Sequence, residues 1–145
     1  MAKGSFKEWL KDREFKKSVV GKSPFTEAVS LLNDVVAGIQ EEMPRKDVLV
    51  RLEPGFATNL GQQYRVTLTT ANGGLDITLF RAYVATDGSR VSFDFYDENP
   101  TTVKADRDSV FNAVAQYMIR PATIANFQQI DEYLSHKKRK KAKVK

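Results

Sequence analysis

Alternating apolar and polar residues, interrupted by short glycine-containing turns, dominate the middle of the sequence. Every second residue is apolar over 48–52, 64–69, 75–84 and 91–96, and this period of two belongs to strands with one buried face. Asn72-Gly73-Gly74 and Asp87-Gly88 provide residues that tolerate positive φ, as tight hairpin turns require. Because strands joined by such turns are antiparallel, the sequence predicts a four-stranded antiparallel meander.

The third of these segments changes its apolar parity partway along. Ile77 and Leu79 share one parity, whereas Phe80 and Val84 take the other. We expect a β-bulge near Phe80-Arg81, because one extra residue moves the following side chains to the opposite face of the sheet. On this interpretation, Ile77 faces the core.

Helical patterns flank the strands on both sides. A first helix is expected to begin at Ser5 with a capping box and to dock on the core through three apolar residues. The alternative is a basic amphipathic helix that binds a membrane surface or a partner. A second should begin after Ser23-Pro24, with Ser23 as its N-cap, and stop at Pro44. Two helices should follow the sheet, one capped by Asp106 and one spanning about 124–134. The predicted order is α-α-β-β-β-β-α-α, a single α+β domain over residues 1–136. The residues expected to be nearly buried are Leu32, Val36, Val66, Ile77, Phe93, Phe111 and Phe127.

Charge is unevenly distributed along the chain. Residues 24–136 contain nine basic and fifteen acidic residues, a net charge of −6, whereas residues 137–145 contain seven basic residues and no acid. A like-charged run with little apolar content predicts a disordered basic tail. Clustered cations attract polyanions by releasing counterions, so the tail is either a nucleic-acid contact or a solubilising end. The candidate nucleic-acid-binding residues are Lys137, Lys138, Arg139, Lys140, Lys141, Lys143 and Lys145.

The sequence contains no catalytic or metal-binding signature. The chain has no cysteine, and its single histidine, His136, borders the basic tail, where no scaffold would position it. Asp94, Asp97 and Glu98 lie close together and could supply oxygen ligands for a divalent cation, but their spacing fits no known loop. We therefore expect no metal and no cofactor, and the sequence favours a non-enzymatic protein.

Only general expectations about the cellular compartment and the function follow from the sequence. No apolar run is long enough to cross a bilayer, and the first residues lack the pattern of a signal peptide. A cytoplasmic location is expected, with the nucleus as the alternative suggested by the basic run. The polar sheet face could be plain solvent surface or a protein interface.

Two functions of different classes fit this sequence. The first is a binding or accessory module whose body contacts a protein partner and whose tail contacts nucleic acid or a ribonucleoprotein. The second is a small-ligand-binding protein or small enzyme with a pocket between the curved sheet and a helix. The residues expected to line such a pocket are Tyr64, Arg81, Tyr83 and Phe93.

Overall fold

The fold is a five-stranded antiparallel sheet with helices before and after it. The computed structural model describes residues 5–20 and 23–143. The expected α+β class and antiparallel sheet are confirmed, but the strand number of four and the helix order are wrong. The elements are α1 (Phe6–Asp12), α2 (Phe15–Val20), α3 (Pro24–Glu42), β1 (Val48–Thr58), β2 (Gly61–Thr70), β3 (Asp76–Ala85), β4 (Arg90–Asp94), β5 (Thr101–Lys104), α4 (Arg107–Met118) and α5 (Pro121–Lys143).

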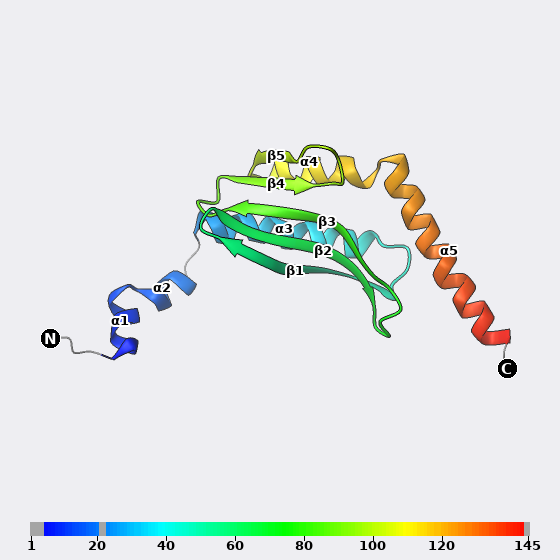
Figure 1. The fold of residues 1–145 in the computed structure, drawn as a ribbon, viewed down its shortest axis with the longest axis horizontal. Helices are drawn as coiled ribbons and strands as arrows, with labels where there is room; N and C mark the ends of the chain where they lie inside the picture. Colours follow the sequence, from blue (N-terminus) through cyan, green and yellow to red (C-terminus); the bar gives the residue numbers. More distant parts are fainter. Residues whose placement is uncertain (1–4, 21–22, 144–145) are drawn as a thin grey trace.

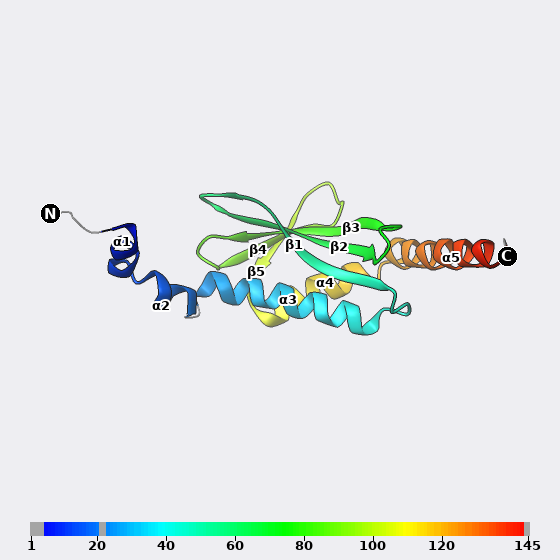
Figure 2. The ribbon, with the colours of Figure 1, turned by 90° about the horizontal axis from the view of Figure 1, so that it is seen from below.

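The sheet and two of the helices form two layers. The strand order is β1-β2-β3-β4-β5, and each strand is antiparallel to the next. Helices α3 and α4 cover one face of the sheet, and the other face is open (Figure 2). The core lies between the layers. Its fully buried large side chains include Leu32, Val66, Leu68, Phe80, Phe93 and Val110.

The strand that the sequence did not reveal is β5. Thr101–Lys104 pairs with β4, with Val103 opposite Val91 and Thr101 opposite Phe93. Val103 is the only apolar residue of this four-residue strand, so no alternation could signal it. Pro100 lies just outside the strand and removes no donor from the ladder.

The predicted bulge lies in β3, slightly earlier than expected. Phe80 is opposite Val66 and Thr78 is opposite Thr67, so Leu79 is the extra residue. Phe80 and Leu79 are both buried, but Ile77 is 38% exposed, and its predicted burial is wrong. The described pairs between β3 and β4 run from Arg81 to Val84, which leaves Ile77 on a stretch of β3 that β4 does not flank.

All three predicted N-caps are confirmed, and the Ser5 hydroxyl accepts a hydrogen bond from the Glu8 amide at 3.4 Å. The Ser23 hydroxyl accepts a hydrogen bond from the Thr26 amide at 3.2 Å, and an Asp106 carboxylate oxygen accepts from the Ser109 amide at 2.8 Å. Of the other predicted core residues, Leu32, Val66 and Phe93 are buried as expected. Val36, Phe111 and Phe127 are only partly buried against the core.

The N-terminal region departs most from expectation. The single helix predicted there is interrupted at Glu14, whose φ is +55°, and α1 packs on α2. Docking on the core is wrong: none of the residues of α1 is buried, and Phe6 and Trp9 are 77% and 53% exposed. The two helices extend beyond the end of α3, away from the sheet (Figure 1). We refer to α1 and α2 together as the N-terminal arm.

The C-terminal helix leaves the body at the opposite end of the molecule (Figure 1). Its backbone remains helical to Lys143, past the expected domain end at His136. The side chains of 137–145 lie outside the described part of the structure, so the mobility of this tail remains a prediction. In the described part of the chain, no helix combines the length and apolar character needed to cross a membrane.

Candidate partner-binding groove

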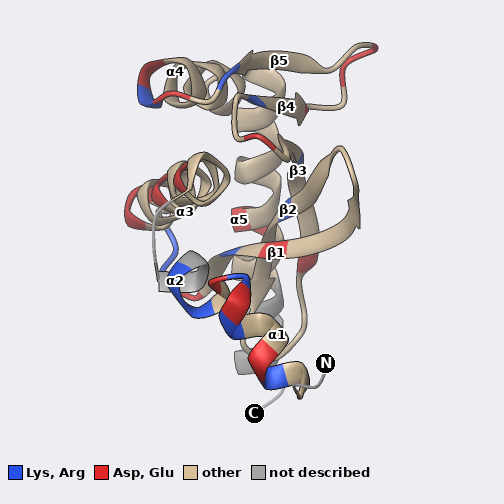
Figure 3. Ribbon diagram, turned by 90° about the vertical axis from the view of Figure 1, so that its left-hand side faces the viewer, with Lys and Arg blue, Asp and Glu red and all other residues tan. Residues whose placement is uncertain are grey.

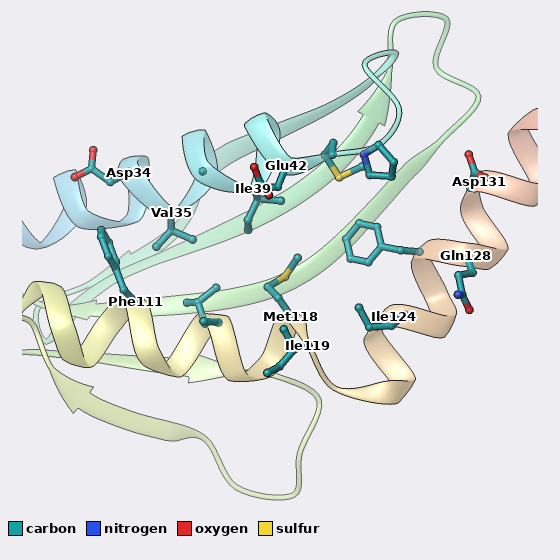
Figure 4. Close-up of a pocket in the computed structure, with 16 residues that line it drawn as sticks. Asp34, Val35, Ile39, Glu42, Phe111, Met118, Ile119, Ile124, Gln128 and Asp131 are labelled. Carbon is teal, nitrogen blue, oxygen red and sulfur yellow. The ribbon is translucent and has the colours of Figure 1, made fainter.

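An open apolar groove lies on the outer side of the helical layer, where α3, α4 and the start of α5 meet (Figure 4). Its volume is about 680 Å³. The apolar side chains that line it include Val35, Ile39, Phe111, Met118, Ile119 and Ile124. Polar side chains, among them Asp34, Glu42, Gln128 and Asp131, lie at its edges.

The groove exists because the apolar stripes of its helices are wider than the sheet can cover. In α4, Val110, Val114 and Tyr117 are buried, while Phe111 and Met118 lie beside them and line the groove. A helix that packs against one layer buries only part of a stripe of this width. The remaining apolar surface is therefore left to face the groove.

Small residues keep part of the groove open. Gly38 is in the middle of α3, where glycine costs roughly 0.5–1 kcal/mol relative to alanine. A Cβ built at Gly38 would have no neighbouring atom within 4 Å, so no contact inside the chain requires glycine there. Ala115 of α4 also lines the groove. Together these residues leave room for a partner to approach closely.

Acidic residues stand at the edges of the groove. Asp34 and Glu42 form no ion pair with the described residues. Asp131 receives a hydrogen bond from Arg45 at 3.3 Å, and Arg45 also binds Asp47 at 3.0 Å. The hydrogen bond to Asp47 raises the pKa of Arg45. The groove thus joins an apolar surface to uncompensated negative charge.

Arg45 also fixes one end of the groove. Its Nη1 donates to the Ser135 hydroxyl at 3.0 Å as well as to Asp131. These contacts join α5 to the loop that follows α3, just after the groove residues Met43 and Pro44. The position of α5 at the groove is therefore held by side-chain hydrogen bonds as well as by apolar packing.

The four pocket residues expected from the sequence lie on opposite faces of the sheet. Directly opposed residues lie on the same face of an antiparallel sheet, and the register places Tyr64 and Phe93 toward the helices. Arg81 and Tyr83 lie on the open face, where the Tyr83 hydroxyl is 2.6 Å from that of Thr58. Burial raises the pKa of Tyr64. None of the four is among the described side chains that line the groove.

The open face of the sheet carries a row of charges that compensate one another. Glu53, Arg65, Arg81 and Asp94 are directly opposite one another across β1 to β4. Glu53 accepts a hydrogen bond from Arg65 at 3.1 Å. Each arginine therefore has an acidic residue on one side, an arrangement that suits a solvated sheet face.

Asp97, one of the carboxylates considered as cation ligands, and the N-cap residue Asp106 have structural roles. Asp97 accepts two hydrogen bonds from Arg120, at 3.0 and 2.9 Å, and this pairing lowers the pKa of Asp97. The Ser109 amide lowers the pKa of the capping residue Asp106. Over residues 5–20 and 23–143, no three acidic or histidine side chains gather in a way that could hold a metal ion.

Several groove residues, among them Phe111 and Phe127, follow the same helical pattern as core residues. Sequence patterns show which side of a helix is apolar but not how much of that side another layer covers. Gly38 within α3 was an available signal, because an interior glycine costs helix stability and here serves no turn.

Comparison with protein-family models, characterised proteins and solved structures finds no match for this chain.

Proposed function

We propose that this chain is a non-enzymatic binding module that holds an amphipathic helix of a protein partner in the groove. The observation that carries the proposal is the open apolar surface between three helices. Ile119 and Ile124 line it and are 71% and 43% exposed. Partner helices recognised in this way present apolar anchors at i, i+3 or i+4, and i+7, and burial of such anchors supplies much of the affinity.

A protein partner suits the groove better than a small ligand does. Small-ligand sites enclose most of the ligand and direct a few polar groups at it. Here the groove is open to solvent, and Asp34 and Glu42 carry negative charge at its edges. We therefore favour the binding module over the small-ligand protein or small enzyme.

The basic tail supplies a second contact in this proposal. Helix α5 projects from the body (Figure 1), and residues 137–145 add seven positive charges beyond the acidic region 24–136. Distance from the acidic body reduces repulsion of a polyanion, since charges are screened beyond about 8 Å at physiological salt. Nucleic acid or a ribonucleoprotein fits this charge.

Site-specific photo-cross-linking tests the groove. A photoreactive phenylalanine analogue at Ile119 should cross-link a partner segment with helical apolar spacing in extracts of the producing cells. The matched control is the same analogue at Leu60, which is 77% exposed at the β1–β2 turn, far along the chain from the groove. Identical products from both positions, or no product from position 119, would contradict the proposal.

A salt titration tests the tail. If about five charges engage single-stranded RNA, the slope of log K against log salt should be roughly −3.5, with Kd on the order of 10⁻⁴–10⁻⁶ M at physiological salt. A chain ending at His136 should lose this binding while keeping the thermal unfolding midpoint of the full chain, because no core contact is removed. Equal binding by both chains would show that the tail only solubilises the protein.

A further inference from the structure

The N-terminal arm has the properties of a helix that is missing its partner. Phe6, Trp9 and Phe15 are all more than half exposed, although large aromatic side chains are costly to leave in water. Residues 5–20 contain five basic and three acidic residues. The arm is therefore basic and amphipathic. The Arg13 guanidinium lies 4.5 Å from the centre of the Trp9 ring, but none of the residues of α1 is buried.

The groove is complementary to the arm in its apolar surface and in its charge. Its floor is apolar, and α3, which forms one wall, has four acidic residues and no lysine or arginine between Pro24 and Glu42 (Figure 3). Asp34 and Glu42 stand at the groove without ion-pair partners among the described residues. A basic helix with aromatic anchors would cover the floor and neutralise this edge.

We propose that the groove is occupied by α1 of a second copy of this chain, so that two copies exchange N-terminal helices in a symmetric dimer. This inference rests on the proposed function, because it names the occupant of the same groove. Exchange of identical elements closes a two-fold dimer, in which both arms and both grooves are satisfied.

The direction of the arm favours a second copy over the arm's own groove. The groove residues of α3 run from Asp34 to Met43, in its C-terminal half. The arm leaves from the N-terminal end of α3 and points away from that half (Figures 1 and 2). It would have to reverse its direction to reach its own groove, whereas the groove of a second copy can be placed beside the arm as it stands.

Helix α1 is also short enough to lie within the groove. With a rise of 1.5 Å per residue, α1 is about 10 Å long and the groove-lining stretch of α3 is about 15 Å long. Gly38 lies within this stretch and leaves open space above the helix. A short helix can therefore lie within the groove with its aromatic residues directed at the floor.

Sedimentation and tryptophan emission test the dimer. We expect twice the chain mass of 16.4 kDa at high concentration, and dissociation on dilution should shift the emission of Trp9, the only tryptophan, to the red. Trp9→Ala should weaken association by about 30-fold or more, as expected for a buried aromatic anchor. Phe56→Ala, on an exposed aromatic of β1 outside the groove, should leave association unchanged. Equal effects of the two substitutions would overturn the inference.

A groove-filling variant separates binding from folding. Gly38→Leu introduces a side chain where a Cβ meets no atom, and leucine is the better helix former. The variant should therefore fold normally, with an unchanged circular dichroism spectrum, but remain a monomer. Dimerisation as strong as that of the unmodified chain would show that the groove is not the interface.

Engineered cysteines distinguish exchange between chains from closure within one chain. Because the sequence has no cysteine, Asp12→Cys on one copy and Gly38→Cys on another can be joined by a short bismaleimide. A two-chain product from the mixture, stronger than from either variant alone, supports exchange. A chain carrying both cysteines that cross-links only to itself would overturn exchange in favour of internal closure.

The two proposals fail in different ways. A chain that is monomeric at every concentration, yet still cross-links a helix of another protein from position 119, overturns the dimer but leaves the binding module intact. Absence of both the dimer and the cross-link overturns both proposals.

Discussion

Replacing Phe80 by alanine should be among the most destabilising substitutions in this protein. Phe80 is fully buried, and its ring meets those of Phe93, Phe95 and Tyr117 edge-on, at centroid distances of 5.9, 5.3 and 5.8 Å. Phe→Ala in a core costs about 3–5 kcal/mol, and edge-on aromatic pairs add to the burial term. We expect a loss of about 4–5 kcal/mol in the free energy of unfolding.

Ile77→Ala is the matched comparison, because the bulge at Leu79 separates the two residues. Ile77 is 38% exposed and β4 does not flank it. Core Ile→Ala costs about 2–5 kcal/mol, so the partial exposure of Ile77 should reduce its cost to about 1 kcal/mol. The bulge places both residues on the helix-facing side of the sheet, Phe80 opposite Val66 and Ile77 opposite Leu68, so the difference in cost should come from how well each side chain is covered.

Urea unfolding followed by far-ultraviolet circular dichroism measures both variants. Trp9 is unsuitable as the reporter because it lies in the exposed α1. With a slope of about 2 kcal/mol per molar urea, the midpoint should fall by about 2 M for Phe80→Ala and by about 0.5 M for Ile77→Ala. Equal shifts, or a larger shift for Ile77→Ala, would refute the difference in burial on which this reasoning rests.

Two further predictions concern a turn and an ion pair. Gly88→Ala should destabilise the fold by about 2–3 kcal/mol, because φ is +70° and a Cβ there would overlap the backbone of Pro24. Gly73→Ala, with φ of +74° but open space, should cost only about 1 kcal/mol. Thermal unfolding compares the two, and equal costs would mean that Gly88 does not contact α3. Arg120 lowers the pKa of Asp97 below its ordinary value of 3.8, so stability from this pair is present above about pH 4 and is lost as the pH falls through the lowered pKa. Asp97→Asn should make unfolding less pH-dependent below about pH 4; an unchanged profile would show that the pair contributes nothing.

Local chemistry determined much of this fold. The alternation in 48–52, 64–69, 75–84 and 91–96 and the glycine turns predicted four of the strands and their antiparallel order. Ser23 and Asp106 were identifiable as N-caps because each bonds to an amide three residues away. Signals of this kind are contained within a few residues of sequence, and no distant contact is needed to read them.

Only the tertiary structure decided which apolar surfaces are covered. Phe111 and Val114 look alike in the sequence, yet Val114 is buried and Phe111 is only partly covered at the groove. Trp9 follows the same helical pattern as a core residue but lies on an arm that the sheet does not reach. β5 exists because β4 offers a free edge to a segment with a single apolar residue. Periodicity gives the direction in which a side chain points, whereas burial depends on what lies in that direction, and that is fixed by residues far away in the chain.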